Sequence, residues 1–178
     1  SPIPAIKNPL PRIVVEIPDN SKMLYNLGMD KEITTSTILF NINHPKSLKD
    51  ETVGDLQESI YSSMVAEMLS ARLREIAQKP DAPFMSASAS YRSLARVNNT
   101  FGLYISPKPN QQQEAFKSAL TELNRAVKFG FTQAEIDRTI SVYENYYQTK
   151  ITKLDQTSHF EIVNEMIKNY LENEAMVD

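Results

Sequence analysis

The feature that most constrains the fold is a pair of alternating segments in mid-chain, separated by only one or two residues. In residues 97–106, apolar side chains alternate with polar or small ones, as in a strand with one buried face. Residues 84–94 also alternate, with small side chains at every second position. One face of this segment consists of Met85, Ala87, Ala89 and Tyr91. So short a connection predicts an antiparallel hairpin, whose second strand should bury Phe101, Leu103 and Ile105.

Two more strands are predicted upstream of this hairpin. Residues 35–42 are rich in β-branched side chains, with Ile38, Phe40 and Ile42 on one face, and the dipeptide His44-Pro45 ends the pattern. An earlier alternating segment consists of Met23, Tyr25, Leu27 and Met29 with smaller or more polar neighbours. Together with the hairpin, these segments predict a sheet of at least four strands.

Helical patterns account for most of the remaining chain. The first runs from about Thr52 to Gln78, and Pro80 and Pro83 close it. The second ends at Gly130, and its apolar stripe is Phe116, Leu120, Leu123 and Val127. The third has a stripe of Ile136, Ile140, Tyr143, Tyr147, Ile151 and Leu154. The fourth begins at residue 157 or 158, and its stripe is Phe160, Val163, Met166 and Tyr170.

The joint between the second and third helices has the most specific local signal in the chain. Thr132-Gln133-Ala134-Glu135 is a capping box, in which the threonine hydroxyl accepts from a free amide and the glutamate returns to the threonine amide. Phe131 and Ile136 flank it as a hydrophobic staple. Gly130 stands where a helix end needs a left-handed residue. Thr132 is therefore the expected N-cap of the third helix.

The order of these elements predicts the fold class. Strands come in pairs, and helices do not alternate with single strands, which disfavours a doubly wound parallel sheet. The sequence predicts an α+β fold in which helices pack on one face of an antiparallel sheet of four or more strands.

The composition excludes several classes of function. The 178 residues suit one domain with a full core. There is no cysteine, so thiol catalysis and Cys-based zinc sites are excluded, and the four glycines form no phosphate-binding motif. The net charge is −3 and no basic run occurs, which argues against a nucleic-acid partner. No apolar run approaches the ~20 residues of a membrane-spanning helix.

The start of the chain is rich in proline, with five of the ten prolines in the first eighteen residues. Proline fixes its own φ and keeps the preceding residue out of the helical region, so this stretch should be extended. We expect residues 1–18 to be a linker, residues 19–178 to form one domain, and the chain to be a fragment of a longer protein.

Catalytic chemistry finds little support in the residues themselves. A zinc hydrolase needs two histidines one helical turn apart, whereas His44 and His159 are far apart in sequence and form neither H-E-x-x-H nor H-x-x-E-H. No G-x-S-x-G elbow marks a serine nucleophile. Three tyrosines at helical spacing could stack a ligand, but such a pattern is more typical of a core and its margin; they are Tyr143, Tyr146 and Tyr147.

The order of several short motifs resembles one protein family. These motifs are Arg72-Leu73-Arg74-Glu75-Ile76, Ala82-Pro83-Phe84, Phe101-Gly102-Leu103-Tyr104-Ile105, Leu123-Asn124-Arg125 and the run from Phe129 to Ile136. Asp30-Lys31-Glu32-Ile33-Thr34 is similar to the start of the same domain, and Tyr170-Leu171-Glu172-Asn173-Glu174 to its end. From about residue 12 onward, the chain resembles the non-catalytic second domain of pitrilysin/insulinase-type zinc metallopeptidases, the inverzincins.

This resemblance implies a fold and a set of partners. It implies a metallohydrolase-like two-layer sandwich that adjoins a catalytic domain, so that paired domains enclose a chamber in which peptide substrates are cleaved. The zinc ligands and base of the family sit in H-x-x-E-H, which this sequence lacks, so no cofactor is expected in this fragment and zinc is expected in the catalytic domain of the parent. The resemblance leans to a bacterial source and to the periplasm, with the cytoplasm as the alternative.

One candidate site also follows from the resemblance. In related domains an arginine before the second hairpin strand and a nearby aromatic residue can face the substrate, and Arg96 and Tyr104 occupy comparable places here. A turn arginine and an edge tyrosine without function are the simpler alternative. Two functions remain open: a non-catalytic chamber-wall and peptide-contact domain of a zinc peptidase, or a scaffold or binding subunit that kept the fold and lost catalysis.

Overall fold

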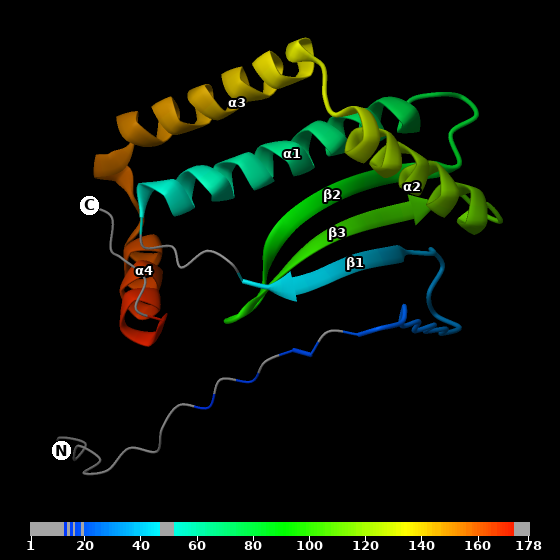
Figure 1. Ribbon diagram of the computed structural model, residues 1–178, viewed down its shortest axis with the longest axis horizontal. Coiled ribbons are helices and arrows are strands. Elements are labelled where there is room, and N and C mark those ends of the chain that lie inside the picture. The colour runs from blue at the N-terminus through cyan, green and yellow to red at the C-terminus, as the bar shows by residue number, and fades with distance from the viewer. Residues whose placement is uncertain (1–12, 14, 16, 19, 47–51, 173–178) are drawn as a thin grey trace.

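The computed structural model describes residues 13, 15, 17–18, 20–46 and 52–172. The elements are β1 (Ile38–Pro45), α1 (Val53–Ala77), β2 (Phe84–Ala95), β3 (Asn98–Pro107), α2 (Gln112–Phe129), α3 (Gln133–Thr152), a 3-10 turn η1 (Leu154–Gln156) and α4 (His159–Glu172). Figure 1 shows α1 lying between the sheet and α3, with α2 near one end of the sheet and α4 standing apart at the other. Most of the expected linker, residues 1–18, lies outside the described residues.

The described sheet is antiparallel and has the order β1-β3-β2. The predicted hairpin is confirmed as β2 and β3. In register, Ile38 faces Ile105 and Phe40 faces Leu103, so the apolar residues of both strands share one side of the sheet. Leu103 and Ile105 are buried as predicted, and Phe101 is partly buried against the same core.

The expectation of four or more strands is wrong for the described part of the chain, where the sheet has three. The segment expected to supply another strand, residues 23–29, is extended but joins no ladder, and Met29 is 86% exposed. Alternation specifies which side chains would share a face. It does not supply the neighbouring backbone with which a strand must exchange hydrogen bonds.

A β-bulge changes the face assigned to the start of β2. The register shifts between Phe84 and Ser86, so one extra residue enters the strand. As a result Phe84 is fully buried and Met85 is exposed, whereas strict alternation placed Met85 on the same face as Ala87. The prediction that Met85 shares a face with Ala87 is therefore wrong. Beyond the bulge, Ala87, Ala89 and Tyr91 lie on one face of β2, as expected.

The core lies where α1 and α2 meet the helical side of the sheet. Its buried members are Leu69, Leu73, Phe84, Ala87, Leu103, Ile105, Ala115 and Ala119. Two of them are alanines one turn apart on α2, and such small side chains let the helix approach β3 closely. The centre of the buried face of α2 is therefore the pair of alanines rather than the predicted stripe. Phe116, Leu120 and Leu123 flank the buried alanines, while Val127 is exposed.

The helix boundaries follow local capping signals. Thr52 is the N-cap of α1, with Asp55 closing a capping box, and Gln78 is its C-cap, as the first helical pattern predicted. The third pattern ends earlier than expected, since α3 stops at Thr152 and η1 holds Leu154. Ser158 and Glu161 exchange the two hydrogen bonds of the capping box expected before α4.

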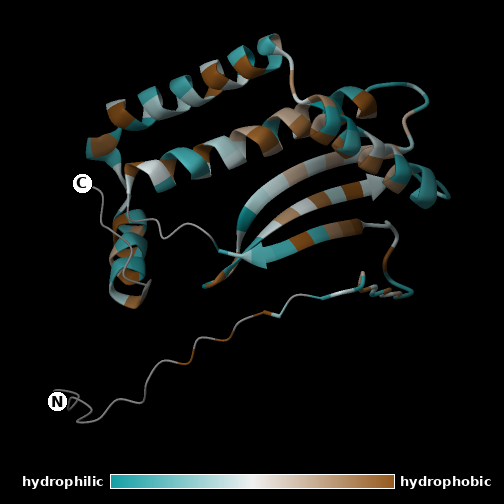
Figure 2. Cartoon of the chain, in the orientation of Figure 1, coloured by the Kyte–Doolittle hydropathy of each residue, from teal (hydrophilic) through white to brown (hydrophobic). Residues whose placement is uncertain are grey.

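The last two helices have apolar residues that the described chain leaves largely uncovered. Figure 2 shows hydrophobic residues spread along α3 and α4, away from the sheet. Every apolar residue of the predicted α4 stripe is exposed; these are Phe160, Val163, Met166 and Tyr170. Among the described residues, none of the helices is both long and apolar enough to cross a bilayer.

Candidate functional site

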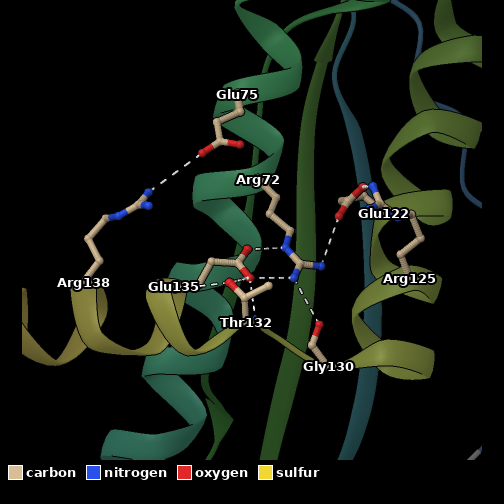
Figure 3. Close-up of polar contacts among 8 residues, drawn as sticks. All are labelled: Arg72, Glu75, Glu122, Arg125, Gly130, Thr132, Glu135 and Arg138. Atoms are coloured by element: carbon tan, nitrogen blue, oxygen red, sulfur yellow. Dashed lines mark hydrogen bonds and ion pairs between the residues drawn. The ribbon is translucent and has the colours of Figure 1, made fainter.

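The most connected polar site joins three helices through Arg72 (Figure 3). Arg72 projects from α1, and its guanidinium donates to Glu135 at the start of α3, with Nη2 2.8 Å from Oε2. It also donates to the Gly130 carbonyl at 3.1 Å and to Glu122 Oε1 on α2 at 3.3 Å. One guanidinium thus fixes α1 to the end of α2 and the beginning of α3, because its planar fork holds several donors in fixed directions.

Glu122 is the buried carboxylate of this site, with 5% of its side chain exposed. Its second oxygen accepts from Arg125 Nη1 at 2.8 Å, so both oxygens face a cation. Sequence reasoning missed this pair. The available signal was a charged residue in register with Ala115 and Ala119 on the buried side of α2, where a charge needs a partner.

The predicted capping box lies in the same site and is confirmed. The Thr132 amide donates to Glu135 Oε2 at 2.7 Å, and the Thr132 hydroxyl accepts from the Glu135 amide. The hydrogen bond from Arg72, followed by those from Thr132, outweighs partial burial and lowers the pKa of Glu135 from 4.5 to about 2. Gly130 has φ +69°, the positive value expected there.

Phe131 has two contacts that the sequence did not indicate. It packs against the core, and the Arg72 guanidinium lies 4.6 Å from its ring centroid, within the range of a cation–π contact. The expected staple between Phe131 and Ile136 remains a prediction. The whole arrangement has a clear structural consequence: it sets the direction in which α3 leaves α2.

The two histidines lie on different elements. His44 is the penultimate residue of β1, stacks on Tyr91 with ring centroids 5.5 Å apart, and places Nδ1 3.0 Å from the Pro45 carbonyl. His159 is the first residue of α4. Across the part of the chain that the structure describes, no three His, Asp or Glu side chains come together in a group that could hold a metal ion. The zinc of the inverzincins therefore has no fitting ligand set among these residues.

Arg96 and Tyr104, the candidate substrate contacts, are both accessible but are well separated. Arg96 lies exposed in the turn between β2 and β3. Tyr104 lies six residues beyond the start of β3, or about 20 Å along an antiparallel strand. It is 47% exposed on the sheet face opposite the helices, beside Leu39 and Ser88.

The sheet face that carries Tyr104 is polar and built from small residues along its middle, while Leu39 and Arg92 lie in the rows on either side. Its central row pairs Asn41, Gly102 and Ser90 across the three strands. A Cβ on Gly102 would lie 2.7 Å from the Asn41 side-chain oxygen, so the glycine makes room for that amide to lie flat across the sheet. The uncharged central row can offer hydrogen bonds to a polypeptide without a protruding side chain, and exposed Arg92 adds a cation in the adjoining row.

A second accessible region is a groove between α1 and α3, with a volume of about 530 Å³. Its walls are Leu56, Ser59, Ile60, Ser63 and Glu67 from α1 and Val142, Tyr143, Tyr146 and Tyr147 from α3. The three tyrosines, expected to belong to a core and its margin, thus lie on an open surface, where Tyr146 and Tyr147 meet edge to face.

The described residues form an α+β domain with helices on one face of an antiparallel sheet. A family model described as "Peptidase M16 inactive domain" matches residues 6–143. The chain belongs to this peptidase family, and the resemblance inferred from motif order is confirmed. No curated protein matches the chain.

Solved structures of insulinase-type proteases share the fold. The first half of the periplasmic protease PqqL from Escherichia coli superposes with a TM-score of 0.73 at 16% identity, covering 84% of this chain and 32% of that one. The PqqL structure that is not limited to the first half superposes with a TM-score of 0.72 at 17% identity, covering 84% of this chain and 16% of that one. A predicted insulinase family protease from Yersinia pestis gives 0.67 at 11% identity, covering 82% and 31%. The chain therefore spans about a third or less of each of these proteins.

Proposed function

We propose that this chain is a non-catalytic domain of a zinc-dependent peptidase, where it forms part of the wall of a proteolytic chamber. The observation that carries the proposal is the match of the inactive-domain family over residues 6–143. Further support comes from the similar protease chains, which are between about two and a half and about five times as long as this one, as expected if other domains perform the chemistry. Zinc would be bound by an H-x-x-E-H motif in the catalytic domain of the parent, and the periplasm is the proposed compartment.

Peptide contact is the second part of the proposal. The open sheet face would look into the chamber, because its central row is polar, uncharged and free of large side chains. On this face the Tyr104 ring would pack against a substrate side chain while its hydroxyl exchanges a hydrogen bond with the peptide backbone. Arg96, at the hairpin turn, would contact a different part of the peptide, since about 20 Å of strand separates the two residues.

The parent protein provides the decisive experiment. The full open reading frame that encodes this chain should be expressed, and its zinc content and cleavage of a mixed peptide library measured. Stoichiometric zinc and cleavage are expected. A parent with neither would contradict the proposal and support the alternative, a scaffold or binding subunit with the same fold. In the isolated chain, stoichiometric zinc that is abolished by His44→Ala or His159→Ala would contradict the non-catalytic assignment.

The peptide-contact role is tested by kinetics of the same parent. Tyr104→Ala and Arg96→Ala should each raise KM several-fold with a smaller change in kcat, because they would remove binding shared by ground and transition states. Tyr61→Ala is the matched control, since Tyr61 is an exposed tyrosine on α1, on the other side of the sheet. An equal effect of Tyr61→Ala, or none from Tyr104→Ala and Arg96→Ala, would remove the contact role.

A further inference from the structure

We propose that the groove between α1 and α3 is a docking site for a basic amphipathic helix, one that places an apolar face against the tyrosines and a lysine or arginine beside Glu67. Under the proposed function this helix would belong to another domain of the same parent, and only the origin of the helix rests on that function. The groove and its preference for a basic partner follow from the residues described below.

The shape of the groove suits a helix. α1 and α3 are joined near Arg72 and Glu135, and the groove opens beyond this joint, between the first half of α1 and the second half of α3. Two helices side by side, with apolar residues on the facing slopes, form the surface on which an amphipathic helix can lie.

The walls of the groove are apolar but remain accessible. Leu56 on α1 is 55% exposed, and Val142 and Tyr146 on α3 are exposed to a similar degree. Farther along α3, Ile151 and, past its end, Leu154 are also exposed. Apolar residues gathered on one groove differ from scattered single residues and are typical of an interaction site. A groove that runs between two helices favours an elongated partner over a small molecule.

Charge determines which kind of helix fits. Between Val53 and Ala71, α1 contains three acidic residues, Asp55, Glu58 and Glu67, and no lysine or arginine. Of these, Glu67 lines the groove itself. Its charge reaches the tyrosines, because burial first and Glu67 second raise the pKa of Tyr143. A cation placed at this end of the groove would meet both a carboxylate and aromatic rings.

The partners that Glu67 and Tyr146 already have do not occupy the site. Glu67 accepts from Arg74 Nη2 at 2.6 Å, but both side chains are about half exposed, and such surface pairs contribute little. A second cation can therefore share the carboxylate. Lys150 lies 5.5 Å from the Tyr146 ring centroid and is not among the lining residues. The preference for a cation is thus confined to the Glu67 end.

The charge of α4 argues against this helix as the occupant, whether from the same chain or from a second copy. α4 is amphipathic, but its described side chains include two glutamates, Glu161 and Glu165, against a single lysine, Lys168. It would bring glutamates toward Glu67, the charged residue that lines the groove. A basic helix from elsewhere avoids this repulsion, and long-range attraction would also speed its association.

The test is binding of synthetic helices to this chain. The probe is an amphipathic peptide of leucine and lysine, about 18 residues or five helical turns long. Two matched peptides accompany it: one with glutamate in place of each lysine, and one of the same composition scrambled so that it has no apolar face. Affinity would be measured by fluorescence anisotropy, and the contact surface by backbone amide chemical shifts. We expect the lysine peptide to bind and to shift the amides of Tyr143, Tyr146 and Tyr147.

Substitutions in the chain locate the site. Leu56→Ser should weaken binding about tenfold and Glu67→Gln about threefold, the latter as for an exposed ion pair. The matched controls are Leu27→Ser, an exposed leucine outside the helices and the sheet, and Glu114→Gln, an exposed glutamate on α2. Both should bind as the unaltered chain does. All four residues are exposed, so the variants should fold, which circular dichroism would verify.

Several results would overturn the proposal. They are absence of binding by the lysine peptide, equal binding by the glutamate or scrambled peptide, and equal loss of binding in Leu27→Ser and Leu56→Ser. None of them bears on zinc or cleavage in the parent. The groove can therefore fail while the peptidase assignment stands, and the assignment can fail while the groove binds its helix.

Discussion

The two halves of α1 have different surroundings, although they belong to one continuous helix. In the second half, Leu69 and Leu73 are buried between the hairpin and α2, and Arg72 ties the helix to α3. In the first half, Val53, Leu56 and Val65 remain exposed. The change occurs near Ala66, the first buried residue of the helix.

This difference separates helix formation from burial. Both halves carry apolar residues at helical spacing, and the helix is continuous through both, with the capping box at Thr52 stabilising its open end. What distinguishes the halves is the presence of neighbouring elements. Where the described chain supplies a sheet and a second helix, the apolar residues form a core; where it does not, they stay exposed, and Leu56 lines the groove. The open half is therefore the part of the domain suited to a partner.

The largest expected effect contrasts one leucine from each half. Leu73→Ala should cost about 4 kcal/mol of unfolding free energy, because Leu73 is fully buried in the core and its removal leaves a cavity. Leu56→Ala should cost well under about 1 kcal/mol, since Leu56 lies on the open groove. Urea unfolding of both variants measures the difference. Similar losses would show that the open half of α1 is packed in solution.

The next effect concerns two arginines in the buried second half of α1. Arg72→Ala should cost about 3 kcal/mol, because it removes a cation from buried Glu122 and several donors from the joint of α2 and α3. Arg74→Ala removes only the exposed pair with Glu67 and should cost less than about 1 kcal/mol. Thermal unfolding compares the two. A larger loss in Arg74→Ala would mean that the joint does not depend on Arg72.

The same contrast explains how much of the molecule was predictable from sequence. The hairpin, the bounds of α1 and the joint at Thr132 depend on residues close together in the chain, where periodicity and capping chemistry act directly. The order of the motifs was sufficient to indicate the family. The three-helix site of Arg72 was not predictable, because its members meet only after α1, α2 and α3 have packed.

The errors have the same origin. Residues 23–29 alternate as a strand does, yet the described sheet offers them no ladder. The bulge at Met85 follows from the register between β2 and β3, which one strand cannot reveal. The tyrosines of α3 have core-like spacing but lie on the groove, because no further described element covers them. The roles of Arg96 and Tyr104 remain predictions, since both depend on a substrate.

The third prediction uses pH to test the contact between Arg72 and Glu135. Because the pKa of Glu135 is lowered from 4.5 to about 2, its stabilising interactions are complete above pH 4.5 and are lost as the pH falls toward 2. The melting temperature of Glu135→Gln should therefore lie below that of the unaltered chain at pH 7, and the gap should narrow between pH 4.5 and 2. A fifth of the side chain is exposed, so solvent screening makes this effect smaller than that of Arg72→Ala. The gap for Glu114→Gln, an exposed glutamate on α2, should not narrow in this way. A constant gap for Glu135→Gln would contradict the contact with Arg72.

The smallest effect compares two N-caps: Thr132 on α3, beside the buried half of α1, and Thr52 at the open end of α1. Thr132→Ala removes the hydroxyl that accepts from the Glu135 amide and should cost about 1 kcal/mol, whereas Thr132→Ser keeps the hydroxyl and should cost less. Thr52→Ala removes the corresponding acceptor for the Asp55 amide at the open end of α1. There the first turn can fray without disturbing the core, so the loss should be smaller than for Thr132→Ala. Urea unfolding of the three variants decides the order. If Thr52→Ala is the most damaging, the first half of α1 is held in place by more than its own cap, and the contrast between the two halves must be abandoned.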